Sequence, residues 1–135
     1  MKELIQYPPK ILLAFGEAVN GNKPIQDWLL KNGYPELAAL AFAIRGSDEA
    51  FTWLLNNGFP HFAALDSAID EKQNAYQWLK DNNLTFHIVF ADACHNKKEA
   101  IAWFAKNNLH SLLRIAISIR KLRDSHTFDY HKLHF

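Results

Sequence analysis

The chain has 135 residues, of which 49% are hydrophobic and 21% are charged, and its formal net charge is +1. This length is enough to bury a core, and the composition excludes intrinsic disorder. The single cysteine excludes an internal disulfide, and the longest apolar run, 37–44, is too short to cross a membrane. The near-zero charge argues against a dedicated nucleic-acid binder. Since the N-terminus does not resemble a signal peptide, we expect a soluble cytoplasmic protein.

A 25-residue repeat runs through the chain. The tryptophans are spaced by this interval, at Trp28, Trp53, Trp78 and Trp103. Four residues after each comes an asparagine, at Asn32, Asn57, Asn82 and Asn107. Periods of 20 to 50 residues predict a stacked array of similar units. We therefore expect one helical-repeat domain, 1–135, with a half-repeat at 3–27, repeats at 28–52, 53–77, 78–102 and 103–127, and a capping tail at 124–135.

Each repeat is predicted to hold two helices. Ala50, Trp53 and Leu54 form one apolar stripe at helical spacing. The Asn-Gly or Asn-Asn pair that follows favours a helix C-terminus, because both residue types tolerate the left-handed conformation. Pro35 and Pro60 then suit the first turn of a second helix. Two short helices and their turns fill 25 residues, so the fold is expected to be an all-α αα-hairpin repeat solenoid of about four and a half repeats.

Tryptophan is predicted to form the structural core of this stack. The periodic Trp28, Trp53, Trp78 and Trp103 would fill the space between helices that approach closely at alanine columns. One buried tryptophan removes about 150–250 Å² from water, so four of them would dominate the core. The alternative, a ligand cage built from these rings, is disfavoured by their regular spacing.

Two phrases resemble ankyrin repeats. EAFTWLLNNG, from Glu49 to Gly58, is similar to the second helix and following turn of an ankyrin unit. PELAALAFAIRG, from Pro35 to Gly46, is similar to the first helix of the next unit. Ankyrin repeats have 33 residues, and the eight missing here correspond to the β-hairpin finger. The resemblance implies a right-handed ankyrin-like superhelix without fingers and a protein-binding role.

Candidate binding residues lie in two variable columns of the second helices. The first column contains Phe42, Ser67, Asp92 and Ile117. The second contains Arg45, Asp70, His95 and Arg120. The alternating charge favours a surface ladder in which Arg45 pairs with Asp70, and Asp70 with His95. The alternative is a partner-binding ridge on the concave face, formed by these eight residues.

No motif in the sequence indicates an enzyme or a cofactor. His126, His131 and His134 have spacings that fit zinc, but no cysteine accompanies them, so we expect no metal site. His87 falls in an apolar column, and Cys94 replaces isoleucine in a core column, so both are expected to be buried. Asp92 and His95 form a carboxylate–imidazole pair without a nucleophile. A small hydrolytic or metal-dependent activity on the concave face therefore stays a second alternative.

The C-terminal region carries the main charge asymmetry. Residues 101–135 hold six basic and two acidic residues. The alternative function suggested by this patch is nucleic-acid binding through Arg120, Lys121 and Arg123.

The last helix has more apolar positions between 112 and 122 than one stripe can use. The side chains of Phe128, Tyr130, Leu133 and Phe135 are expected either to fold back as a cap or to leave an interface. The second case would give a weak homodimer through the C-terminal end in place of a monomer. Taken together, these features favour a non-catalytic protein–protein interaction scaffold whose partner is unknown.

Overall fold

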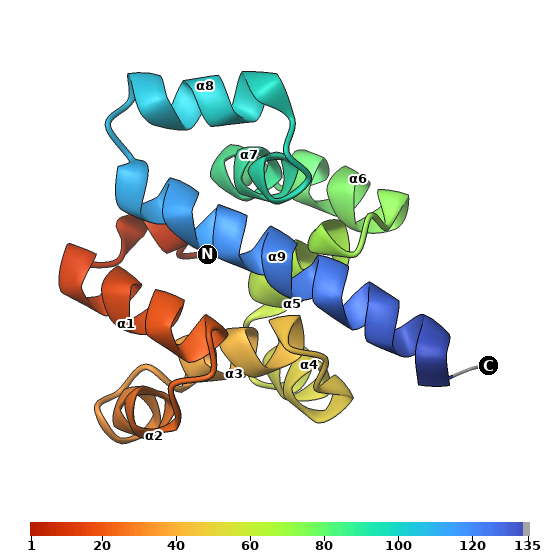
Figure 1. The fold of residues 1–135 in the computed structure, drawn as a ribbon. Helices are drawn as coiled ribbons and strands as arrows, with labels where there is room; N and C mark the ends of the chain where they lie inside the picture. The colour runs from red at the N-terminus through yellow and green to blue at the C-terminus, as the bar shows by residue number, and fades with distance from the viewer. Residues whose placement is uncertain (134–135) are drawn as a thin grey trace.

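The computed structural model describes the backbone of residues 1–133 and the side chains of residues 1–125. In this part of the chain the secondary structure is entirely helical (Figure 1). The elements are the 3₁₀ turn η1 (Leu4–Gln6) and the helices α1 (Pro9–Val19), α2 (Lys23–Lys31), α3 (Pro35–Ile44), α4 (Asp48–Asn56), α5 (Pro60–Ile69), α6 (Gln73–Asp81), α7 (Thr85–Cys94), α8 (Lys98–Lys106) and α9 (His110–Leu133). The predicted all-α helical-repeat fold is confirmed.

The turns between the helices follow the predicted pattern. α3 and α5 begin at Pro35 and Pro60, where the missing N–H leaves no hydrogen bond unmade. The residue after each repeated asparagine has a left-handed backbone, with φ between 58° and 89°, at Gly33, Gly58, Asn83 and Asn108. The asparagines themselves have ordinary φ values and act through their side chains. Each donates Nδ2–H to the carbonyl of the tryptophan four residues earlier, at 2.7–2.8 Å, and so caps the helix end.

The odd-numbered helices form an inner layer that closes on itself. α1, α3, α5, α7 and α9 each contact the next, and α9 also contacts α1 (Figure 1). α2, α4, α6 and α8 lie outside this ring, each packed against the inner helices before and after it. Where α9 meets α1, Ile115 lies close to Gly16. A Cβ atom on Gly16 would be only 3.0 Å from Cγ1 of Ile115. The array is therefore a closed ring, not an open stack with a concave face.

The tryptophans do not form the core, and this prediction is wrong. Trp28 and Trp103 are 42% and 37% exposed, and Trp53 and Trp78 are only half-buried. The next residue in each repeat is fully buried instead: Leu29, Leu54, Leu79 and Phe104. An outer helix contacts the inner layer along one narrow stripe, and a step of one residue turns the side chain away by about 100°. The Trp53 ring stacks on Phe59, 5.9 Å away, and covers the turn from outside.

Ring closure covers part of the apolar surface of the last helix, whereas Ile117 stays 40% exposed. Leu112, Ile115, Ala116 and Ile119 are buried where α9 packs between α1 and α7. The backbone of α9 continues beyond this contact to Leu133. The predicted cap by Phe128, Tyr130, Leu133 and Phe135, and the histidines His126, His131 and His134, lie outside the residues whose side chains are described.

The N-terminal segment closes one end of the ring. Leu4 in η1 is fully buried, and its N–H donates to Nε2 of His87 on α7 at 3.1 Å. The Glu3 carboxylate accepts the backbone N–H of His87 at 3.0 Å. Tyr7 donates its hydroxyl to Glu36 of α3 at 2.8 Å, so this short segment joins two inner helices. Among the described helices, none combines the length and the apolar character needed to cross a membrane.

Candidate functional site

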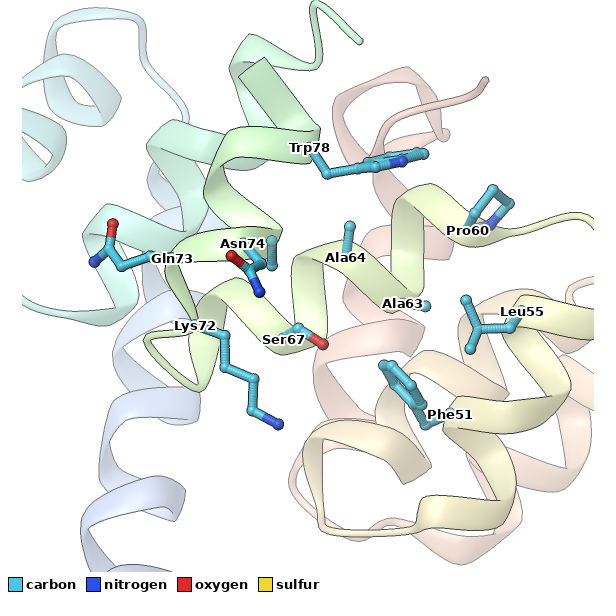
Figure 2. A pocket seen from close by; sticks show the side chains of 11 residues that line it. Phe51, Leu55, Pro60, Ala63, Ala64, Ser67, Lys72, Gln73, Asn74 and Trp78 are labelled. Atoms are coloured by element: carbon cyan, nitrogen blue, oxygen red, sulfur yellow. The ribbon is translucent and has the colours of Figure 1, made fainter. Parts of the chain in front are cut away.

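An apolar groove lies between the outer helices α4 and α6, with α5 as its floor. Figure 2 shows Leu55 and Phe51 of α4 on one side, Trp78 of α6 on the other, and Ala63 and Ala64 between them. Its volume is about 560 Å³. The small side chains of α5 leave this space open, while the larger side chains of the outer helices form its walls.

A second groove lies between α2 and α4, with α3 as its floor, and has a volume of about 410 Å³. Each of its lining residues has a counterpart 25 positions later in the first groove. The pairs are Leu30 and Leu55, Pro35 and Pro60, Ala39 and Ala64, Phe42 and Ser67, Ser47 and Lys72, Glu49 and Asn74, Ala50 and Ala75, and Trp53 and Trp78. The two grooves are therefore copies of one feature of the repeat.

The walls of both grooves leave large apolar side chains in water. Leu30 and Leu55 are 47% and 49% exposed. One repeat further on, the corresponding position is Lys80, and the groove floor would include Asp92. The apolar character of this surface therefore belongs to the first two full repeats.

The structure brings some residues of the predicted ridge together in pairs: Ser67 and Asp70 line one cavity, and His95 and Arg120 line another. Phe42 and Ser67 line the two grooves. Ile117 is 40% exposed on α9. The second column, with Arg45, Asp70, His95 and Arg120, lies at the end of the ring where the inner helices have their C-termini.

The predicted ladder of Arg45, Asp70 and His95 is not formed. Arg45 donates Nη1–H to the carbonyl of Val19 at 2.9 Å, and His95 places Nε2 2.8 Å from the carbonyl of Ile69. Both therefore bind the C-terminal carbonyl of the preceding inner helix, where the helix end carries partial negative charge. Asp70 pairs with Arg123 of α9 instead. The column holds adjacent repeats together, and closure of the ring supplies the partner of Asp70.

The nucleic-acid candidates are mostly engaged with carboxylates. Arg123 pairs with Asp70, and Arg120 lies 3.9 Å from Asp124. Lys121 is exposed. Two of the three cations thus have an acidic neighbour, which weakens their attraction for phosphate.

Asp92 and His95 meet a third group, the hydroxyl of Tyr76. This hydroxyl lies 3.1 Å from Asp92 Oδ1 and 3.0 Å from His95 Nδ1. Tyr76 donates its single hydroxyl proton to Asp92, and its oxygen lies against Nδ1 of His95. Nε2 of His95 faces the carbonyl of Ile69 and therefore carries a proton. Burial and Asp92 raise the pKa of Tyr76, so it stays a neutral donor. The cluster joins α6 to α7, and Lys97 binds Asp92 at 3.2 Å.

The buried groups expected from the sequence are buried. His87 is fully buried, and Cys94 is 3% exposed. Burial raises the pKa of the Cys94 thiol, so the reactive thiolate is disfavoured. Within the described part of the chain, no group of three or more His, Cys, Asp or Glu side chains has an arrangement that could hold a metal ion.

Comparison of the chain with protein-family models, curated proteins and solved structures finds no match. The grooves are a candidate binding feature that sequence reasoning missed. Their signal was present in the pairs Leu30 and Leu55, and Pro35 and Pro60, which recur with the repeat. Because leucine at helical spacing usually means core, that signal could be read only after the outer helices were placed.

Proposed function

We propose that the chain is a non-catalytic protein-interaction module that binds a partner protein in its two outer grooves. The observation that carries this proposal is the recurrence of one apolar groove at the repeat spacing. Contiguous exposed apolar surface is typical of interaction sites, because burying it against a partner removes it from water. Leu30 and Leu55 gain most from such burial, since each is about half exposed.

The spacing of the grooves favours a helical partner segment. The two grooves lie on either side of α4, so their separation is about that of packed helices, 8–10 Å. Residues seven positions apart on an α-helix are separated by about 10 Å along its axis. One partner helix with bulky apolar residues at i and i+7 would therefore reach both grooves.

Two features of the sequence support the same proposal. The helix phrases that resemble ankyrin repeats imply a protein-binding scaffold, since ankyrin arrays present repeated surfaces to protein partners. The free thiol of Cys94 suits a reducing compartment, and we propose that the partner is met in the cytoplasm.

The proposal is tested by a double substitution on the groove walls. Leu30→Lys and Leu55→Lys place charges in both grooves, whereas Leu13→Lys is the matched control, because Leu13 is 57% exposed on α1 and lines neither groove. Photo-crosslinking in host extract, read by quantitative proteomics, should give a partner with wild type and Leu13→Lys. That partner should be lost with the double variant.

Retention of every crosslinked protein by the double variant would refute the proposal. Thermal unfolding of all three proteins provides the folding control. Since the substituted leucines are exposed, the changes should alter the free energy of unfolding by less than about 1 kcal/mol.

A further inference from the structure

Four equivalent carbonyl groups lie at one end of the ring. They belong to the last residues of α1, α3, α5 and α7: Val19, Ile44, Ile69 and Cys94. Among the described residues, no backbone N–H outside the helices donates to any of these four oxygens. Because the C-terminal end of a helix carries partial negative charge, each carbonyl attracts a donor or a cation.

Two of these carbonyls have a donor supplied by the next repeat. Arg45 reaches Val19 and His95 reaches Ile69, at 2.9 Å and 2.8 Å. The repeat between them has Asp70 at the same position. A carboxylate has no proton to donate, so the carbonyl of Ile44 lacks the contact that its neighbours have.

A cavity of about 480 Å³ lies at this position, and Ile44, Asp66 and Asp70 are among its lining residues. Asp66 is only 7% exposed, and its Oδ1 is buried without a hydrogen-bond partner. A buried carboxylate oxygen without a donor is costly, and native structures usually satisfy such a group. The cavity therefore combines an unpartnered carboxylate with a carbonyl whose equivalents at Val19 and Ile69 bind N–H donors.

We propose that this cavity binds a small organic cation with N–H donors, an alkylguanidinium or alkylammonium compound. Its charged group pairs with Asp66 and donates to the carbonyl of Ile44. It thus takes the place that Arg45 and His95 fill in the neighbouring repeats. The cavity adjoins the first groove and shares Phe51, Ser67 and Lys72 with it, but neither Leu30 nor Leu55 lines the cavity.

The charges around the cavity favour a cation. Asp48, Asp66 and Asp70 are opposed by Lys72 and Arg123. Arg123 already pairs with Asp70, so the rim accommodates a guanidinium group from the chain itself. The remaining groups carry one more negative than positive charge when Asp66 is ionised.

Burial raises the pKa of Asp66 to about 7. The neighbouring charges act in both directions, because Asp70 and Asp48 raise this pKa whereas Arg123 and Lys72 lower it. Below this pKa the carboxyl is neutral and attracts a cation weakly. Binding should therefore strengthen as the pH rises from 6 to 8.

The test is a titration with agmatine, which carries a guanidinium and an ammonium group, followed by ¹⁵N–¹H correlation spectra at pH 8. We expect saturable shifts of the amides at 44–47 and 66–72. N-butylurea, an uncharged compound with similar N–H donors, should not shift the resonances of these amides. Asp66→Asn should raise the dissociation constant at least about ten-fold, because a hydrogen bond to a charged group is lost. Asp27→Asn, which removes an exposed carboxylate on α2, should leave the dissociation constant within about two-fold of the wild-type value.

A second variant tests the analogy between repeats. Asp70→Arg places an arginine at the position that Arg45 holds one repeat earlier. Its guanidinium group should occupy the cavity and abolish agmatine binding. Absence of saturable shifts with wild type, equal shifts with N-butylurea, or unchanged affinity in Asp66→Asn would each overturn the proposal. The Leu30→Lys and Leu55→Lys double variant should bind agmatine normally, so a failure here is distinct from a failure of the proposed protein interaction.

Discussion

Two buried histidines stand out at the scale of single residues. His61 and His87 stack with their ring centres 6.1 Å apart, and both are almost completely buried. Nε2 of His87 accepts the N–H of Leu4, so the proton of the neutral ring is on Nδ1, which has no partner. Burial lowers the pKa of His87 to about 3 and also lowers the pKa of His61. A second proton, which would make either ring a cation, is therefore disfavoured in the folded protein relative to the unfolded chain.

His87 should make the protein less stable in acid. Its pKa is about 3 when folded and 6.5 when unfolded, so its contribution to stability is present above pH 6.5 and is lost as the pH falls towards 3. His87→Gln keeps an acceptor for Leu4 but does not titrate. Between pH 6.5 and 4, the free energy of unfolding of wild type should fall relative to His87→Gln by about 1.4 kcal/mol per pH unit. Urea unfolding at several pH values measures this, and parallel pH profiles would contradict it.

Asp66 gives the matched control, because its effect has the opposite sign. Its folded pKa of about 7 lies above the reference value of 3.8, so its contribution to stability is present below pH 3.8 and is lost as the pH rises through 7. In the same urea experiment, the free energy of unfolding of Asp66→Asn should therefore rise relative to that of wild type as the pH increases from 4 to 7. Opposite pH trends in the two variants would show that the effects come from His87 and Asp66 themselves and not from a general destabilisation by acid.

At the scale of an element, the turn after each inner helix requires a left-handed residue. Gly21, Gly46, Glu71 and Asn96 hold this position, with φ of 90°, 108°, 65° and 60°. Glycine has no Cβ to clash in this conformation, and asparagine tolerates it, whereas glutamate pays a steric cost. The turn at Glu71 is therefore the least favourable of the four.

Glu71→Gly should stabilise the protein by about 1 kcal/mol, because it removes the strain of a positive φ. The reverse change, Gly46→Ala, should destabilise it by a similar amount. No atom lies within 4 Å of a Cβ placed on Gly46, so its effect would report backbone conformation alone. Thermal unfolding measures both variants. A loss of stability in Glu71→Gly would show that the glutamate side chain contributes more than its backbone costs.

At the scale of the whole molecule, the contact between α1 and α9 closes the ring. Gly16 allows this approach, since any larger residue would meet Ile115. The two residues are far apart in the sequence, so their contact depends on the arrangement of all the helices between them. Closure also gives Asp70 its partner, Arg123.

Gly16→Leu should destabilise the ring by about 1–3 kcal/mol, because the added side chain overpacks the closure. Ile115→Ala, which removes the opposing atoms, should cost about 2–5 kcal/mol alone. Combined, the two changes should cost less than their sum, since the leucine fills the space left by isoleucine. Urea unfolding of the four proteins gives this coupling energy. Additive losses would show that α1 and α9 do not pack as described.

The repeat and its helix boundaries were predictable because their causes are local. Pro35 starts a helix and Gly33 ends the one before it through their own backbone preferences. The roles of Trp53 and Leu54 were not predictable in the same way. Both are apolar and adjacent, and only the position of the inner layer decides that Leu54 is buried and Trp53 lies beside a groove. The sequence therefore showed that the residues of the candidate site recur, but it did not show that they form a surface groove.

The sequence by itself determined an all-α chain of 25-residue αα-hairpins, because spacing, caps and turn residues act within a few positions of one another. Only the tertiary structure decided that the inner helices close into a ring, that Arg45 and His95 bind helix ends, and that Asp66 faces a cavity without a partner. These features depend on contacts between residues that are distant in the chain. Such contacts depend on the packing of every helix between the two residues. A local sequence pattern therefore does not predict them.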